Sequence, residues 1–335
     1  MYTMRRKWLL VIPLALLILY LAGPSPSSPH YSDRMPVVPP NSSDLEQFIR
    51  NMENEHKLKP DNEARIVWAN DSAKEKSDYA IVYLHGFSAS QKEGDPAHRD
   101  LAKKFGCNLF LSRMAEHGID TVDQLIHLTP EEYWESAKQA LAIGKQIGKK
   151  VILMSTSTGG SLALRLAAVY PNDVYALLLL SPNIAINDPF AWMLNNHWGL
   201  QIARMVKHGN YVVSDDDRAI YKQYWNKPYR LEAAVSLEEL LETTMTASNF
   251  KKVDQPVLLL YYYRDEQHQD PVVKVSAMLS MFDELGTPDS LKRKKAMPNT
   301  GNHVLGSPIK SGDVEGVENE LEKFMSEVLK IKKVS

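Results

Sequence analysis

The chain has 335 residues, and its 39 lysines and arginines nearly balance its 41 aspartates and glutamates, for a formal net charge of −2. This length suits one large α/β domain with an appended piece. The balanced charge gives no field that would attract nucleic acid or an acidic substrate. The single cysteine, Cys107, cannot form an internal disulfide. The sequence has no metal-ligand spacing of histidines and cysteines and no phosphate-binding glycine loop, so we expect no metal and no cofactor.

Residues 1–23 are typical of a targeting segment. Basic residues at positions 5–7 precede an apolar stretch over 8–23, which predicts a signal peptide or an uncleaved signal-anchor. The stretch is short for a bilayer of roughly 30 Å, and it lacks a clean small-x-small cleavage site. Because the cleavage site is missing, we expect a single membrane anchor with the rest of the chain outside the cytoplasm. Cleavage would make the protein secreted or periplasmic, and a buried core helix is the alternative. Residues 24–42, rich in proline and serine, predict a flexible tether.

Beyond the tether, strand-like and helix-like segments alternate. A serine cap and an early glutamate predict a helix from residue 42. Runs of strand-forming residues follow at 63–70, 79–86 and 107–113, and a threonine cap with early glutamates opens a helix over 129–148. This alternation predicts an α/β fold with a mostly parallel, doubly wound sheet.

The sequence VILMSTSTGG over residues 151–160 is the most informative of these segments. An apolar strand runs into a turn of small residues, and a helical pattern follows it. This context is typical of a nucleophile elbow, whose usual pattern is G-x-S-x-G. Ser157 takes the nucleophile position, and its neighbours Ser155 and Gly159 are small enough for the strained turn. The alternative is an ordinary strand-to-helix turn with a capping hydroxyl.

A second loop supplies the groups that would stabilise negative charge. The strand over 79–84 ends in His85-Gly86-Phe87-Ser88, where a backbone N–H can turn towards a developing oxyanion. We assign that donor to Phe87 and the second donor to the N–H of Thr158. His85 is expected to be a structural hydrogen-bonding residue of the loop, and a plain turn is the alternative interpretation.

Together, LHGFSAS (84–90), RMAEHG (113–118) and the elbow resemble the α/β-hydrolase superfamily. Within it, they are most similar to carboxylesterases and monoacylglycerol lipases, which often carry an R-x-x-G-H-G loop. Glu116 replaces the first glycine of that loop, as Ser155 replaces the first glycine of the elbow. The resemblance implies an α/β-hydrolase domain over 43–335, with a helical cap insertion at about 184–252.

The resemblance also implies the chain order serine, acid, histidine. Two aspartates, Asp265 and Asp270, follow the apolar run over 255–261. Asp270 is the better candidate because the family's acid precedes a short apolar pair, and Pro271-Val272-Val273 follows Asp270 here. Asp265 stays an alternative, and both carboxylates could be solvated.

The predicted histidine lies in the turn-rich segment MPNTGNHVLGSP (297–308), directly before the last helix. His303 resembles the histidine of the family's late loop. His268, in the acid loop, is the main rival, and we expect its side chain to be exposed.

The predicted cap is rich in aromatic residues, which would make an apolar pocket for an acyl group. We take four of them as candidate substrate-binding residues: Trp192, Trp198, Tyr224 and Trp225. The alternative is that these side chains only pack the cap onto the core.

These parts predict a serine hydrolase that cleaves carboxylic esters through Ser157, Asp270 and His303 and an acyl-enzyme. The expected partner is a small-molecule or lipid-like ester, with no nucleic acid. The same triad would serve an amidase, a peptidase or an acyltransferase. A non-catalytic binding protein of the same fold is the alternative from a different class.

Overall fold

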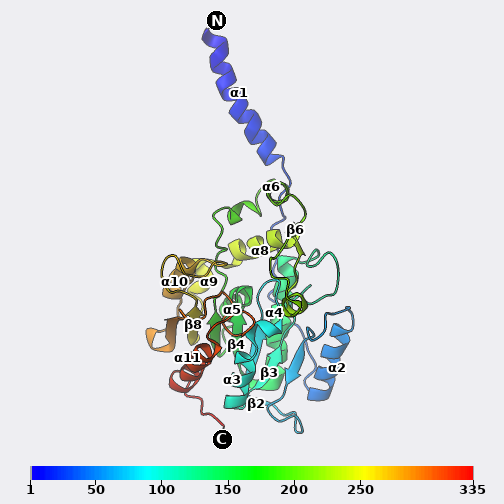
Figure 1. Cartoon of the computed structure of the whole chain (residues 1–335), viewed down its shortest axis with the longest axis vertical. Helices are drawn as coiled ribbons and strands as arrows, with labels where there is room; N and C mark the ends of the chain where they lie inside the picture. Colours follow the sequence, from blue (N-terminus) through cyan, green and yellow to red (C-terminus); the bar gives the residue numbers. More distant parts are fainter. Residues whose placement is uncertain (1, 335) are drawn as a thin grey trace.

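The computed structural model describes residues 2–334, in which a seven-stranded sheet is covered by helices on both faces (Figure 1). The strand order is β1-β3-β2-β4-β5-β8-β9; β1 is antiparallel to β3, and the other neighbouring pairs are parallel. The predicted α/β-hydrolase architecture, a mostly parallel and doubly wound sheet, is therefore confirmed. The strands of this sheet are β1 (Arg65–Val67), β2 (Ser77–Leu84), β3 (Asn108–Leu111), β4 (Gly148–Thr156), β5 (Ala176–Leu180), β8 (Val257–Tyr261) and β9 (Lys292–Ala296).

Alternating side chains of the central strands enter two separate apolar cores. On β2, Val82 and Leu84 join one core, whereas Ile81 and Tyr83 join the other. This is the two-residue period of a strand that is buried on both faces, which explains why these strands are continuously apolar in sequence.

Helices α3 (Ala97–Phe105) and α11 (Val314–Glu327) contribute to one core; α2 (Ser42–Glu53), α4 (Pro130–Ile147), α5 (Thr158–Val169) and α10 (Val275–Glu284) contribute to the other. The predicted threonine cap of α4 is present as a reciprocal capping box between Thr129 and Glu132. The cap of α2 is Asn41, whose side chain accepts a hydrogen bond from Asp44 N–H, and not a serine as the sequence suggested. Asparagine serves this position as well as serine does.

The cap lies between β5 and β8. It contains a two-stranded antiparallel ribbon of β6 (Tyr211–Val212) and β7 (Tyr229–Arg230). Its helical elements are the short η2 (Ala191–Met193), α6 (Gly199–Val206), α7 (Ala219–Tyr224), α8 (Leu231–Thr244) and α9 (Ala247–Phe250). Phe250 belongs to the core on the α5 and α10 face of the sheet. The last part of the predicted insertion therefore packs with the seven-stranded sheet and its covering helices, which together we call the base.

Helix α1 (Tyr2–Leu21) projects from the body at the end that carries α6 and β6 (Figure 1). The large apolar side chains over 12–21 are exposed. Within residues 2–334, no helix combines the length and the apolar character that crossing a membrane requires.

The segment over 24–42 has no regular structure before α2, as predicted, but it is packed onto the domain rather than free. The Lys138 ammonium donates hydrogen bonds to the carbonyls of Ser32 and Arg34, both at 2.8 Å, and the Trp134 indole donates to Ser32 O at 2.9 Å. Lys138 is fully buried, and these carbonyls satisfy its ammonium together with the Glu135 carboxylate at 2.7 Å. Residues 32–34 are therefore attached to α4, and the flexibility of the segment over 24–42 stays a prediction.

Candidate active site

Ser157 occupies the sharp turn between β4 and α5. Its backbone has φ +55° and ψ −124°, a conformation that residues other than glycine rarely adopt. The following Gly159 has no room for a side chain, because a Cβ there would collide with the carbonyl of Leu84 on β2. The turn therefore holds Ser157 at the carboxyl end of the central strand, as the elbow pattern predicts.

Two residues depart from the family's glycine pattern, and the structure treats them differently. Glu116 adopts φ +63°, the left-handed conformation that a glycine would take there, so the residue carries backbone strain. Ser155 is a fully buried strand residue that pairs with β2 and β5, and its hydroxyl has no hydrogen-bond partner among the described residues. Ser155 suits the elbow because its side chain is small, and its hydroxyl contributes no hydrogen bond there.

Asp270 and His303 form a buried pair. His303 Nδ1 lies 2.6 Å from Asp270 Oδ2, and both side chains are buried. The N–H groups of Val272 and Val273 donate to Asp270 Oδ1 at 2.9 and 3.1 Å. Burial raises the pKa of Asp270, but the field and hydrogen bond of His303 and these N–H groups outweigh it, so the pKa is lowered overall. Asp270 is thus held as a carboxylate against the imidazole.

The same balance acts on the histidine. Burial lowers the pKa of His303, and the Asp270 carboxylate raises it through its charge and its hydrogen bond, so the pKa lies above its ordinary value. With Nδ1 donating to Asp270, Nε2 is the nitrogen left to accept a proton. Ser157 and His303 line the same cavity.

The rival residues lie elsewhere. Asp265 Oδ1 is 2.7 Å from His268 Nδ1, and their side chains are 46% and 62% exposed. This pair forms a solvated turn in the loop after β8, with no hydrogen bond or ion pair to His303 or Ser157 among the described residues. The exposure expected for His268 is thus what the structure shows.

Phe87 and Thr158 line the cavity beside Ser157. Within residues 2–334, neither backbone N–H donates a hydrogen bond to the protein, whereas the N–H of Gly86 donates to Glu93 and that of Ser88 donates to His117. Two N–H donors are therefore left free at the positions predicted for an oxyanion hole.

Two buried histidines hold this loop in place. His85 Nε2 accepts from Met114 N–H at 3.0 Å, and His117 Nε2 accepts from Ser88 N–H at 2.9 Å. Each ring's Nδ1 lies against a backbone carbonyl, at 2.9 and 2.7 Å. Burial lowers the pKa of His85 to about 4 and lowers the pKa of His117 well below its ordinary value, so both rings stay neutral. His85 is structural here, in line with the sequence-based expectation.

The sequence reasoning missed Glu93. This carboxylate is 2% exposed, lines the cavity, and accepts the Gly86 N–H at 2.6 Å. Burial raises the pKa of Glu93 to about 7, against the lowering effect of that hydrogen bond. Its charge in turn raises the pKa of His303. A carboxylate in the first turn after the oxyanion loop was the available signal.

The cavity has a volume of about 500 Å³ and lies between the base and the cap. Most of its wall is apolar and comes from the cap. Representative lining residues on α6 and α8 are Ile202, Ala203, Val206, Leu231, Ala234 and Leu237. No group of three or more His, Cys, Asp or Glu side chains between residues 2 and 334 is placed to hold a metal ion.

Of the four aromatic residues predicted to bind substrate, only Trp225 lines this cavity. Trp192 is 54% exposed. Trp198 contacts the end of α1 and the segment that follows it: its indole donates to Leu19 O at 3.0 Å, and its backbone N–H donates to Pro24 O at 2.9 Å. The structure therefore places Trp192 and Trp198 outside the cavity lining: Trp192 is exposed, and Trp198 contacts the N-terminal segment. Their part in substrate binding stays a prediction.

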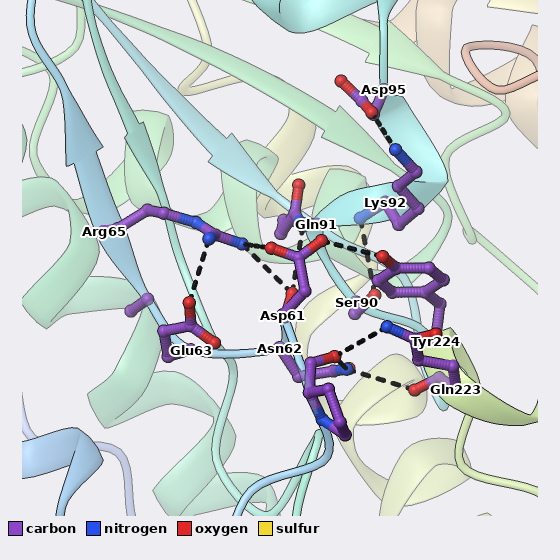
Figure 2. Close-up of polar contacts among 12 residues, drawn as sticks. Asp61, Asn62, Glu63, Arg65, Ser90, Gln91, Lys92, Asp95, Gln223 and Tyr224 are labelled. Carbon is purple, nitrogen blue, oxygen red and sulfur yellow. Dashed lines mark hydrogen bonds and ion pairs between the residues drawn. The ribbon is translucent and has the colours of Figure 1, made fainter. Parts of the chain in front are cut away.

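Tyr224 also lies outside the cavity lining, and Figure 2 shows its surroundings. Its hydroxyl donates to Asp61 Oδ2 at 2.8 Å, and Asp61 also pairs with Arg65. Beside it, Asn62 donates to the carbonyl of Gln223 at 3.1 Å. These bonds attach the end of α7 to the segment before β1, so Tyr224 anchors the cap and does not face the substrate cavity.

A model of the family described as serine aminopeptidase, S33, matches residues 112–299, more than half of the chain. A search of curated protein sequences found no match. Solved structures with the same fold include a metagenome-derived lipolytic enzyme from a study of LipS and LipT, at 15% identity and TM-score 0.61, covering 80% of this chain and 99% of that one.

Two further structures are similar. A monoacylglycerol lipase of Paleococcus ferrophilus has 16% identity and TM-score 0.56, covering 78% of this chain and 98% of its own. Est1E of Butyrivibrio proteoclasticus, solved with ferulic acid, has 16% identity and TM-score 0.55, covering 80% and 95%. These likenesses show a shared α/β-hydrolase fold.

Proposed function

The chain belongs to the family described as serine aminopeptidase, S33, and from that premise we propose that it cleaves carboxylic esters as a carboxylesterase or monoacylglycerol lipase-like enzyme. The family and the fold make the chain an α/β-hydrolase of the lipase and esterase type. The pairing of buried His303 and Asp270 in the cavity of Ser157 is the observation that carries the proposal.

In the proposed reaction, the Ser157 hydroxyl attacks the acyl carbonyl and His303 Nε2 takes its proton. Asp270 orients the ring and stabilises the imidazolium that forms. This step matches the observed balance of charges, since the Asp270 carboxylate favours the protonated state of His303. The C–O bond of the ester then breaks as His303 returns the proton to the leaving alcohol.

The negative charge of the tetrahedral intermediate falls on the former carbonyl oxygen, and we assign its stabilisation to the N–H groups of Phe87 and Thr158. Preorganised donors of this kind act on charge that develops only in the transition state. Water, activated by the neutral His303, then attacks the acyl-enzyme and frees Ser157 for the next turnover.

A series of p-nitrophenyl esters of increasing acyl length tests this proposal on the full chain in mild detergent. We expect Ser157→Ala to lose at least about a thousandfold in kcat. Ser248→Ala, which changes an exposed serine of α9, is the matched control and should keep full activity. Hydrolysis that survives Ser157→Ala would remove Ser157 as nucleophile.

A peptidase is the second candidate function, because the family is described as serine aminopeptidase. The same acyl-enzyme would form from an amide. Aminoacyl p-nitroanilides, assayed beside the esters, separate the two: faster amide cleavage would replace the ester assignment. A fluorophosphonate probe addresses the non-catalytic alternative, since a folded wild-type chain that never reacts with it would favour a binding protein.

Attachment to a membrane through residues 1–23, or export after cleavage there, is also part of this proposal. It is supported by the basic and apolar pattern of the sequence and by the exposed apolar side chains over 12–21. Fractionation of cells that express the full chain, with a carbonate wash, tests it: recovery in the soluble cytoplasmic fraction would contradict both forms.

A further inference from the structure

Three lysines line the mostly apolar cavity, and the proposed ester hydrolysis does not use them. They are Lys207, Lys227 and Lys310. Lys207 follows α6, Lys227 precedes β7, and Lys310 lies in the loop after His303, so three separate segments bring positive charge to one cavity.

Two of these lysines, Lys207 and Lys227, have no anionic partner within residues 2–334, and Lys227 is the more buried of the two, since Lys207 is exposed. The Lys227 Nζ lies 5.2 Å from the centre of the Tyr229 ring, and among the described residues it has neither a hydrogen bond nor an ion pair with a carboxylate within 4.0 Å. Burial lowers the pKa of Lys227, and the positive charges of Lys310 and Lys207 lower it further, against a weaker opposite effect of Asp215. An ammonium in this position gains from a counter-anion.

Lys310 is partly neutralised. Its Nζ lies 2.6 Å from Asp216 Oδ2, and 4.2 Å from the centre of the Tyr221 ring. Asp216 also binds the Arg218 guanidinium at 2.7 Å, so one carboxylate is shared between two cations. Around this part of the cavity, positive charge is therefore in excess.

The two carboxylates of the cavity do not balance this charge. Glu93 is bound to the Gly86 N–H beside the catalytic groups, and Asp188 accepts the N–H of Phe190 at 2.8 Å. Neither forms an ion pair with Lys227 in the described chain. The partner that would satisfy Lys227 is thus absent from the protein's own lining residues.

From this arrangement we propose that the cavity binds an ester that carries an anionic group, with that anion held by Lys227 beside Lys310 and its apolar part against α6 and α8. The proposal rests on the ester hydrolysis proposed above and names its substrate class: amphiphilic esters with a carboxylate or a phosphate. The lysines contribute to substrate selection, and the chemistry at Ser157 is unchanged.

Matched substrates test the proposal. The p-nitrophenyl ester of hexanoic acid is compared with the mono-p-nitrophenyl ester of adipic acid, which differs by a terminal carboxylate, and with the analogue that ends in a phosphate. The readout is the ratio of kcat/KM for each anionic ester to kcat/KM for the neutral one, which cancels differences in folding and active fraction. The wild-type ratio is expected to exceed one for at least one anion, and the anion with the higher ratio identifies the group.

We expect Lys227→Met to lower that ratio about tenfold and Lys227→Arg to restore most of it. Lys222→Met is the matched control, because Lys222 lies on α7 outside the cavity lining and its side chain is 57% exposed, paired with Asp217. Its ratio should stay within about twofold of wild type. A ratio that is unchanged in Lys227→Met, or that falls equally in Lys222→Met, would overturn the proposal.

A binding arm keeps this test independent of hydrolysis. Decyl phosphate, decanoate and decanol are titrated calorimetrically into the full chain carrying Ser157→Ala. Tighter binding of an anion than of decanol, lost in the Ser157→Ala, Lys227→Met double variant, would support the site even if no ester is cleaved. Equal binding of all three would refute the anion site while leaving the proposed hydrolysis intact.

Discussion

The base and the cap of this molecule differ in how closely the backbone determines the role of a residue. In the base, the backbone dictates two residues of the elbow: Ser157 has a strained positive φ, and Gly159 has no room for a Cβ. In the cap, large aromatic residues with equal prominence in the sequence have different tasks. Trp225 lines the cavity, whereas Trp198 and Tyr224 attach the cap to the N-terminal segment and to Asp61. The residues of a strained turn therefore indicate one structural role, whereas an aromatic residue of the cap can line the cavity or attach the cap to another segment.

Replacing the acid of the base should give the largest effect. Asp270→Asn keeps the shape of the side chain but removes the charge that fixes the His303 tautomer, so we expect kcat to fall by about 10⁴. Steady-state hydrolysis of a p-nitrophenyl ester measures it. Asp265→Asn is the control, because Asp265 is exposed and paired with His268. A larger loss in the Asp265 variant would reverse the assignment.

Glycine substitutions extend the contrast to stability. A Cβ at Gly159 would collide with backbone atoms of the adjacent strand, so Gly159→Ala should lower the free energy of unfolding by about 3–5 kcal/mol. Gly209, in the cap after α6, has open space around it, and Gly209→Ala should change the value by less than about 0.5 kcal/mol. Urea unfolding monitored by tryptophan fluorescence compares the two. Similar losses in both variants would mean that the cap is as tightly specified as the elbow.

The same contrast explains how far the sequence could predict the molecule. The sheet could be predicted from apolar strand-like runs that alternate with helix-like segments. The candidates Ser157, Asp270 and His303 could be predicted from the order in which an α/β-hydrolase carries its serine, acid and histidine. Glu93 was missed because its role depends on a contact with Gly86 across a turn. The contact of Trp198 with Leu19 could not be predicted, because the two residues lie 179 positions apart in sequence and no local pattern records such a contact.

The pH dependence distinguishes the groups around His303. The imidazole must be neutral to accept the Ser157 proton, so kcat/KM should rise with pH through the raised pKa of His303, above its ordinary value. The Glu93 charge adds to that raised pKa, so Glu93→Gln should move the rising limb to lower pH. The introduced glutamine could still accept the Gly86 N–H through its amide oxygen, which preserves the loop.

The measurement is kcat/KM of a neutral ester across a range of about pH 5 to 9, chosen to bracket the ordinary histidine pKa. The sign of the accompanying stability change is also fixed. Because the pKa of His303 is raised by folding, its contribution to stability is present at low pH and is lost as pH rises through the folded pKa. If the rising limb of kcat/KM in Glu93→Gln lies at the same pH as in wild type, or at higher pH, the Glu93 charge does not raise the pKa of His303.

The smallest expected effect tests the division within the cap. Trp225 is buried, stacks on Tyr221 with ring centres 4.9 Å apart, and lines the cavity. Trp225→Ala should enlarge the cavity and raise kcat/KM for long acyl chains relative to short ones by several-fold, the scale of a few methylene groups in an apolar pocket. Trp198→Ala should leave that ratio unchanged and instead release the segment after α1, which increased proteolysis near residue 24 would report. A shift in chain preference on Trp198→Ala would show that the N-terminal contact shapes the cavity through Gly199, the adjacent lining residue.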